Sequence, residues 1–180
     1  MQREQRETIA GISLSHPDKV LFETQGLTKA DIARHYLRVA DRMLPGIKNR
    51  LVSLVRCPDG PSQQCFFQKH AGRGFPEAVK RQEIIEKDGD KAEYLYVTDL
   101  KGIIAGVQMN TLEFHIWGSR IDALEQPDRL VFDLDPDEGL GFADVRQACF
   151  DLRDRLEDIG LRTLPLVTGG KGGHVVAPLS

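Results

Sequence analysis

The chain has 180 residues, of which 41% are hydrophobic and 28% charged, and its formal net charge is -3. This is the size and composition of about one globular domain, and the apolar share is too high for an intrinsically disordered chain. No stretch approaches the roughly 18 apolar residues that cross a bilayer, and the polar N-terminus leads into no secretory signal, so we expect a cytoplasmic protein without a membrane segment.

The three cysteines, Cys57, Cys65 and Cys149, are an odd number and lack the C-x-x-C spacing of a zinc ribbon. Neither a disulfide framework nor a zinc site is indicated, and we expect reduced thiols.

The charges divide along the chain. Residues 1–75 carry 12 basic and 7 acidic side chains, whereas residues 76–180 carry 12 basic and 20 acidic ones. A basic region attracts phosphates and an acidic one concentrates cations, so the division favours a metal-dependent enzyme that acts on a polyanion. A random surface distribution is the alternative.

The predicted elements begin after a flexible N-terminal tail at 1–12 and an irregular stretch at 13–27. Thr28 and Asp31 have the spacing of a capping box, so a helix is expected to start there and to end at Pro45-Gly46. The further expected elements are strands at 51–57 and 65–69, a second hairpin around 84–97, a short helix at 99–109, strands at 112–117 and 129–133, a helix at 142–159, and strands at 163–167 and 174–177. Hairpins mixed with helices favour an α+β fold, here as one unit over 13–180.

The strongest chemical signal is the segment LVFDLDPD at 130–137. With the side-chain period of a strand, Asp133 and Asp135 share one face, and their Cα atoms are about 6.6 Å apart. Two carboxylates so placed suit Mg²⁺ or Mn²⁺, and a metal pair suits phosphoryl or nucleotidyl transfer. The alternative is a solvated turn at a strand exit.

Two further segments could complete such a site. His115 alternates with apolar residues in TLEFHIW and is expected on a polar strand face, although an isolated strand histidine is more often only hydrogen-bonded. The segment VTGGKGGHVV, with Thr168, Lys171 and His174, lets the backbone approach a phosphate and adds a positive charge. It differs from a Walker A loop, because Gly172 follows the lysine, and it could be a flexible hairpin.

Six segments in this order, HPDKVLF, GLTKADIARHY, CFFQKH, EFHIWGSR, VFDLDPDEGL and TGGKGGHVVAPL, closely resemble the polymerase domain of bacterial ligase D, within the archaeo-eukaryotic primase superfamily. The resemblance runs from about Ser15 to Leu179. It implies a primase-polymerase core with an RRM-like sheet flanked by helices. It also implies template-dependent nucleotidyl transfer in nonhomologous end joining, with manganese (or magnesium) and a preference for ribonucleotides.

The resemblance also implies roles for individual residues. These are metal binding for Asp133 and Asp135, an active-site histidine in His115, nucleotide contacts from Thr168, Lys171 and His174, DNA 5'-phosphate binding by Lys19 and Lys29, and stacking on template bases by Phe66 and Phe67. Lys29 also has local support, because the free amides and dipole of a helix N-terminus favour an anion. Since adjacent strand residues face opposite sides, we expect one of the two phenylalanines to lie in the core.

The expected organisation is a DNA-end-binding region at about 15–75 and a catalytic region at about 93–180. The implied partners are DNA ends with a 5'-phosphate, nucleoside triphosphates, the Ku protein, and ligase and nuclease modules of a parent protein in the bacterial nucleoid. This chain differs from the family at two positions: the family usually has serine where this chain has Thr168, and a larger apolar residue where it has Gly173. The family also has a third metal-binding carboxylate, which lies after the glycine-rich segment, so the catalytic set in this chain is expected to be incomplete. We therefore expect this chain alone to bind 5'-phosphorylated DNA but to polymerise weakly or not at all.

Two alternatives stay open. One is a noncatalytic DNA-end adaptor, which need not bind manganese. The other is a metal-dependent glycosyltransferase, whose D-x-D motif would hold a nucleotide sugar and which would need no basic DNA-binding region.

Overall fold

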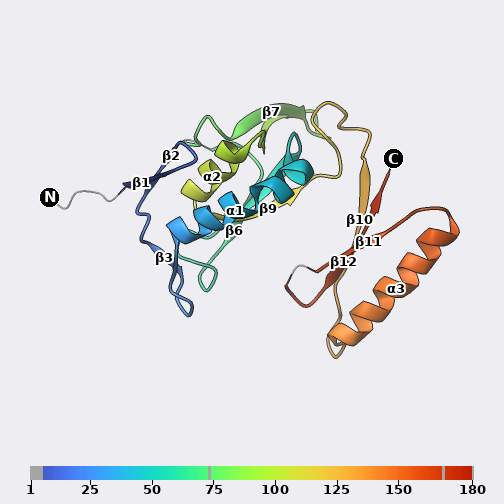
Figure 1. Cartoon of the computed structure of the whole chain (residues 1–180). Helices are drawn as coiled ribbons and strands as arrows, with labels where there is room; N and C mark the ends of the chain where they lie inside the picture. The colour runs from blue at the N-terminus through green and yellow to red at the C-terminus, as the bar shows by residue number, and fades with distance from the viewer. Residues whose placement is uncertain (1–5, 73, 168, 180) are drawn as a thin grey trace. The chain divides into compact units, whose positions relative to one another are not determined.

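The computed structural model describes residues 6–72, 74–167 and 169–179. Its elements are, in chain order, β1 (Arg6–Ile9), β2 (Ile12–Ser15), β3 (Val20–Phe22), β4 (Leu27–Thr28), α1 (Lys29–Ile47), β5 (Leu51–Arg56), β6 (Phe66–Gln68), β7 (Lys80–Ile85), β8 (Lys91–Tyr96), α2 (Leu100–Gln108), β9 (Thr111–Ile116), β10 (Arg129–Leu134), α3 (Phe142–Asp158), β11 (Leu164–Leu166) and β12 (Gly173–Pro178). Helices and antiparallel strands are mixed, which confirms the α+β class (Figure 1).

The chain divides into two compact units, Met1–Trp117 and Gly118–Ser180. The sequence predicts one continuous unit over 13–180, without a boundary at Trp117.

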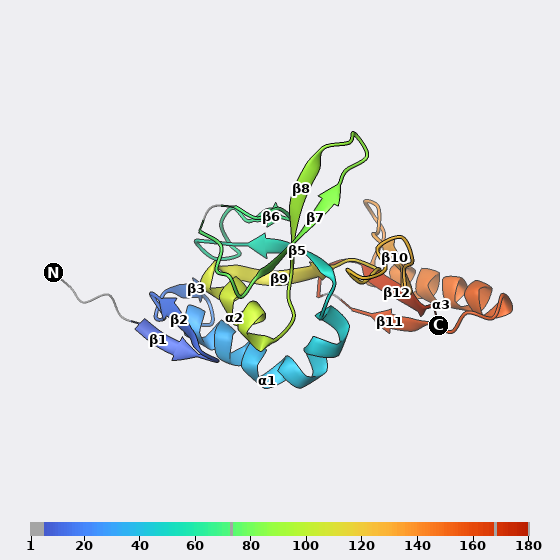
Figure 2. The ribbon, with the colours of Figure 1, turned by 90° about the horizontal axis from the view of Figure 1, so that it is seen from above.

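The first unit is built on a five-stranded antiparallel sheet in the order β6-β5-β8-β7, with β9 paired to β5. Helices α1 and α2 pack against this sheet, and the turn of the β7–β8 hairpin projects beyond the other strands (Figure 2). The buried core between them is formed by apolar residues from all three elements: Ile47, Val52, Leu54, Leu95, Val97, Ile103 and Ala105.

Local signals explain both helix starts in this unit. The Thr28 hydroxyl accepts a hydrogen bond from the Asp31 amide, and the Asp31 carboxylate accepts one from the Thr28 amide, so the predicted capping box is confirmed. Asp99 caps α2 by accepting from the Gly102 amide at 3.0 Å. Helix α1 continues past Pro45 to Ile47, so the helix ends one residue after the expected stop at Pro45-Gly46.

Residues 6–28 are more ordered than the sequence suggests. Strands β1 and β2 form an antiparallel hairpin where a flexible tail is expected at 1–12, and β3 pairs with β4 in the stretch expected to be irregular. Ile9 and Leu14 of the hairpin are buried against Ala33 of α1 and Ile104 of α2. Tertiary packing on two helices therefore orders a segment with weak local signals.

The second unit is a three-stranded antiparallel sheet in the order β10-β12-β11, with α3 packed on it (Figure 1). Helix α3 ends at Asp158, and Gly160 follows with a φ of 83°, as expected for a glycine stop. Strands β11 and β12 pair around the glycine-rich segment, which confirms the predicted hairpin.

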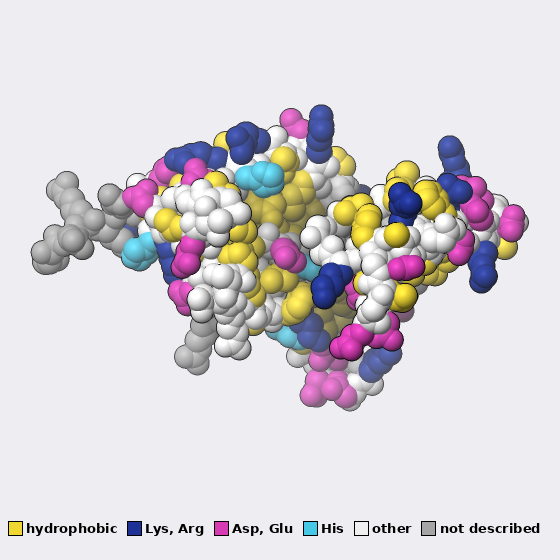
Figure 3. Space-filling view, turned by 90° about the horizontal axis from the view of Figure 1, so that it is seen from below, with side chains coloured by type: hydrophobic (Ala, Val, Ile, Leu, Met, Phe, Trp, Pro, Cys, Tyr) yellow, Lys and Arg dark blue, Asp and Glu magenta, His cyan; other side chains and the backbone are white. Residues whose placement is uncertain are grey.

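The second unit buries few apolar side chains. Figure 3 shows apolar side chains at the surface next to charged ones in the part of the molecule that holds α3. The most exposed large apolar side chains of this unit are Ile159, Val167, Leu164, Leu140 and Phe142. Over the described part of the chain, no helix is both long and apolar enough to span a membrane.

Candidate functional site

Lys19 and Lys29 lie together at the start of α1. The Lys29 amide donates to the Lys19 carbonyl oxygen at 2.9 Å, and the Ala30 amide donates to the Pro17 carbonyl oxygen at 2.9 Å. Together with the cap by Thr28, these bonds use the first amides of the helix. The expectation that free amides would bind an anion here is therefore wrong, and the positive charge of this place comes from the two ammonium groups and the helix dipole.

Lys29 is almost fully buried, with 3% of its surface exposed. Burial, which disfavours the charged form, and the neighbouring charge of Lys19 lower the pKa of Lys29 to about 8. Lys19 is more open and forms an ion pair with Asp59, with 2.9 Å between Nζ and Oδ1. Among the residues that the structure describes, none forms an ion pair with Lys29.

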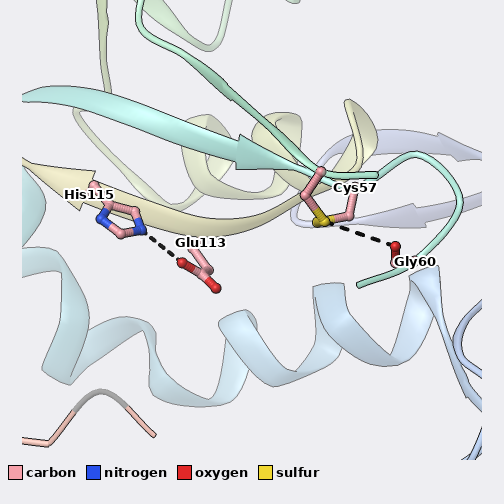
Figure 4. The surroundings of a disulfide bond; sticks show 5 residues. Cys57, Gly60, Glu113 and His115 are labelled. Atoms are coloured by element: carbon pink, nitrogen blue, oxygen red, sulfur yellow. Dashed lines mark hydrogen bonds and ion pairs between the residues drawn. A yellow bond between two sulfur atoms is a disulfide. The ribbon is translucent and has the colours of Figure 1, made fainter. Parts of the chain in front are cut away.

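Asp59 lies in the loop between β5 and β6, which a disulfide closes. Cys57 and Cys65 are bonded, with their Cα atoms 4.4 Å apart, so the expectation of reduced thiols is wrong for this pair, whereas Cys149 is free (Figure 4). The spacing of the cysteines does not predict this pair, because the two residues meet only through the antiparallel pairing of β5 with β6.

Phe66 and Phe67 are both at the surface of edge strand β6, with exposed fractions of 42% and 68%. The expectation that one of them belongs to the core is therefore wrong. The Phe66 ring lies 5.2 Å from the Arg56 guanidinium, and the Phe67 ring lies 5.3 Å from the imidazole of His115. The sheet thus brings one predicted stacking residue next to the predicted active-site histidine.

His115 lies on the exposed face of β9, as the alternation predicts. Its Nε2 is 2.7 Å from Oε2 of Glu113, two residues earlier on the same face (Figure 4). Glu113 was not identified as a functional candidate, although its position two residues from the histidine on a strand was a usable signal.

Asp133, in β10, and Asp135, directly after the strand, are both exposed, and half-buried Leu134 stands between them. Asp133 is opposite His174 of β12, and His174 Nε2 lies 3.0 Å from Asp133 Oδ1. Strand pairing therefore joins two of the predicted segments. Lys171 lies in the exposed turn before β12, and Thr168 lies outside the described residues.

The chemistry of Asp133 and Asp135 fits a divalent cation in part. Two carboxylates on one strand are oxygen donors of the kind that Mg²⁺ and Mn²⁺ take. Over residues 6–72, 74–167 and 169–179, however, no group of three or more histidine, cysteine, aspartate or glutamate residues could hold a metal ion. Among the described residues, Asp133 and Asp135 would therefore supply two of the ligands of a divalent cation, which takes about six or more.

Glycine at position 172 is required by the packing of this site. A Cβ there would lie 2.6 Å from the Leu134 carbonyl oxygen and 2.7 Å from Asp135 Oδ1, so the turn passes directly over the second aspartate. At Gly173, in contrast, a Cβ would make ordinary contacts with Val145 and Cys149, at 3.5 and 3.6 Å.

The candidate residues thus form two sets. The first unit holds the lysines, the phenylalanines and His115, and the second holds the aspartates, Lys171 and His174. Asp59 is the residue that sequence reasoning missed most clearly. It stands in the turn-like sequence PDGP at 58–61, and nothing in the sequence connects it to a lysine 40 positions away.

Comparison with known proteins identifies the family of this chain. Residues 28–180 match the family model described as LigD, primase-polymerase domain. The chain is 36% identical over 175 residues to the multifunctional non-homologous end joining protein LigD of Pseudomonas aeruginosa, covering 97% of this chain and 21% of the relative. It is 32% identical over 163 residues to the bifunctional non-homologous end joining protein LigD of Bacillus subtilis, covering 91% of this chain and 26% of the relative.

A solved structure is also similar. The polymerase domain of Mycobacterium tuberculosis ligase D in complex with DNA superposes with a TM-score of 0.83 at 34% identity, covering 94% of this chain and 61% of that one. The chain thus spans about a quarter or less of the two end-joining relatives and about three fifths of the solved polymerase domain. With a family model that matches most of its length, the chain belongs to the LigD primase-polymerase domain family.

Proposed function

We propose that this chain binds DNA ends that carry a 5'-phosphate and supplies part of a nucleotidyl-transfer site in nonhomologous end joining. The observation that carries the DNA-end part is the pair of ammonium groups at the start of α1, one of them buried and without an ion pair among the described residues. A buried cation needs an anionic partner, and a terminal phosphate supplies up to two charges and three acceptor oxygens. The likeness to a polymerase domain solved with DNA supports the same proposal.

In the nucleotidyl-transfer part, Asp133 and Asp135 would hold a divalent cation, manganese or magnesium, which would neutralise the triphosphate of the incoming nucleotide. Lys171 would pair with the phosphates of that nucleotide, a ribonucleotide by preference. His174 keeps the Asp133 carboxylate in place through their 3.0 Å contact. His115 and the exposed ring of Phe67 would contact the primer or template, because aromatic rings stack on bases of any sequence.

The lysine pocket is tested by measuring the affinity of the chain for two DNA duplexes that differ only in a 5'-phosphate or 5'-hydroxyl at a recessed end. Fluorescence anisotropy gives both dissociation constants. Since a charge-assisted hydrogen bond contributes about 1.5 kcal/mol or more, we expect the wild-type chain to prefer the phosphate by about tenfold. Lys19→Gln and Lys29→Gln should each reduce this preference.

The matched control is Lys87→Gln, which removes the same charge from an exposed position in the β7–β8 turn. It should lower both affinities alike and keep the preference. A phosphate preference that survives in the double variant of Lys19 and Lys29 places the phosphate pocket elsewhere.

The noncatalytic adaptor remains a second candidate, because the described residues offer only two metal ligands close together. Titration of Mn²⁺, followed by the loss of its free-ion EPR signal, separates the two. Binding that Asp133→Asn and Asp135→Asn abolish, and that Asp158→Asn at the end of α3 preserves, supports the nucleotidyl-transfer site. Absence of Mn²⁺ binding favours the adaptor. Membership of the LigD family leaves the glycosyltransferase alternative without support.

The remaining expectations from the resemblance belong to this proposal. They are an association with the Ku protein and with ligase and nuclease modules of a parent protein, and a place in the bacterial cytoplasm at the nucleoid. The names of the relatives, which describe multifunctional and bifunctional end-joining proteins, support the modules.

A further inference from the structure

Asp59 pairs with Lys19, one of the two lysines proposed to bind the 5'-phosphate. Its Oδ1 lies 2.9 Å from Lys19 Nζ, the usual distance of a charge-assisted hydrogen bond. Lys19 in turn is close enough to Lys29 to lower the pKa of Lys29. The two lysines are also joined through their backbones, because the Lys29 amide donates to the Lys19 carbonyl oxygen at 2.9 Å. One carboxylate thus already pairs with one of two neighbouring lysines.

The position of Asp59 is fixed by the loop that carries it. The Cys57–Cys65 disulfide closes the loop (Figure 4). The Cys57 amide donates to the Asn110 carbonyl oxygen at 2.9 Å. On the other side of Asp59, Gly60 packs so closely on β3 that a Cβ would lie 2.2 Å from the Leu21 carbonyl oxygen. The loop is thus fixed on both sides of Asp59, at Cys57 and at Gly60, and Gly60 packs on β3, the strand that directly follows Lys19.

The positive charges of Lys19 and Lys29 exceed the single negative charge of Asp59, so this region favours a further anion. Of the two neighbouring lysines, only Lys19 pairs with a carboxylate among the described residues, and Lys29, at 3% exposure, is screened poorly by water. Asp59 carries a single charge and its side chain is 74% exposed, so its pairing with Lys19 is weak. A terminal phosphate carries up to two charges and can contact both ammonium groups. It can therefore replace Asp59, whereas a singly charged phosphodiester gains less from doing so.

We propose that Asp59 is an intramolecular competitor of the DNA 5'-phosphate for Lys19, and that it sets the affinity of the pocket. This inference rests on the proposed function, namely that Lys19 and Lys29 bind the phosphate. Asp59 holds Lys19 in position in the free protein and is displaced when a 5'-phosphorylated end binds.

The test compares Asp59→Asn with the wild-type chain on the 5'-phosphate and 5'-hydroxyl duplexes. The substitution keeps the size of the side chain and removes the competing charge. Because exposed ion pairs contribute 0.2–1 kcal/mol, we expect affinity for the phosphorylated duplex to rise about two- to fivefold, with little change for the hydroxyl duplex.

The matched control is Glu23→Gln, which removes one negative charge from an exposed residue in the turn between β3 and β4. Any general gain in attraction to DNA appears in this variant for both duplexes. A further variant, Asp59→Asn combined with Lys19→Gln, removes the competition, so Asp59→Asn should have no effect in that background. Equal melting temperatures of wild-type and Asp59→Asn proteins verify that folding is unchanged.

The outcomes separate the inference from the function on which it rests. If the wild-type chain prefers the phosphate, and the lysine variants lose that preference, but Asp59→Asn behaves like Glu23→Gln, only the role of Asp59 is refuted. The same holds if Asp59→Asn acts equally with and without Lys19. If the wild-type chain shows no phosphate preference, the pocket itself is refuted, and the competitor role with it.

Discussion

Lys29 combines two properties that rarely occur together in a lysine, burial and the absence of an ion-pair partner among the described residues. Burial, reinforced by Lys19, lowers its pKa from 10.5 to about 8, so its ammonium group loses its proton as the pH rises through 8. The residue would therefore be a strong phosphate ligand near neutral pH and a weak one in mild alkali. An exposed lysine would keep its charge over the same range.

We accordingly expect the preference for a 5'-phosphate over a 5'-hydroxyl end to fall as the pH rises from 7 to 9. With a pKa of about 8, the protonated fraction of Lys29 drops about tenfold across this range, which is the upper limit of the loss. The terminal phosphate has its second pKa near 6 and stays doubly charged throughout. Anisotropy titrations of both duplexes at several pH values measure the preference, and a constant preference up to pH 9 would contradict the role of Lys29.

Phe66 and Phe67 allow a second prediction at this scale, because neighbouring rings have different surroundings. Phe67 is 68% exposed, whereas the Phe66 ring is covered in part by the Arg56 guanidinium. Phe67→Ala should therefore weaken binding to a duplex with a single-stranded overhang by about 1–3 kcal/mol, the usual contribution of a stacked base, and leave blunt duplex binding unchanged. Phe66→Ala should mainly lower the melting temperature, and equal effects of the two substitutions on overhang affinity would refute this assignment.

At the scale of elements, the most informative comparison is between adjacent glycines at the start of β12. Gly172→Ala would place a methyl group against the backbone of Leu134 and the carboxylate of Asp135, whereas Gly173→Ala would place it against Val145 and Cys149. Gly173 also borders an apolar groove of about 300 Å³. The added methyl group would thus contact polar atoms at position 172 and apolar side chains at position 173.

We expect Gly172→Ala to reduce the free energy of unfolding by about 1–3 kcal/mol through overpacking. Gly173→Ala should raise it by about 0.5–1 kcal/mol, because alanine loses less backbone entropy and buries a methyl group. Urea unfolding followed by circular dichroism measures both, and each variant is the control for the other. Equal effects would mean that β12 does not pass over Asp135 as closely as the structure indicates.

The sequence predicted elements well where their signals are local. The capping box at Thr28 and Asp31, the cap at Asp99 and the alternation in β9 and β10 each depend on residues a few positions apart. The β1–β2 hairpin has no such signal, since its order comes from burial against α1 and α2. The disulfide and the ion pair of Lys19 with Asp59 depend on which loops meet, and composition and spacing do not determine that.

At the scale of the molecule, the two units differ in how much apolar surface they bury. The first unit encloses two clusters of buried apolar residues between its main sheet and its helices. In the described part of the second unit, the buried apolar residues are Val145, Leu156, Val175 and Ala177. Apolar burial is the main favourable contribution to folding, so the second unit should open locally at a lower free energy than the first.

Hydrogen exchange measured by mass spectrometry tests this difference on two matched strands. Strands β8 and β12 are each six residues long, and each is paired on both sides, β8 with β5 and β7, and β12 with β10 and β11. Since their hydrogen bonding is comparable, a difference in exchange reports the stability of the surrounding unit. We expect the amides of β12 to exchange at least about tenfold faster than those of β8, because opening free energies within one protein range from near zero to the global value.

Similar protection in the two strands would mean that the small core of the second unit is sufficient, and that its exposed apolar side chains do not weaken it. Faster exchange in β12 has a consequence for function, because this strand carries His174 opposite Asp133. The carboxylates proposed to bind metal would then lie on the less stable unit, so the pair should become better ordered when a cation binds. In that case Mn²⁺ should slow exchange in β10 and β12 and leave β8 unchanged.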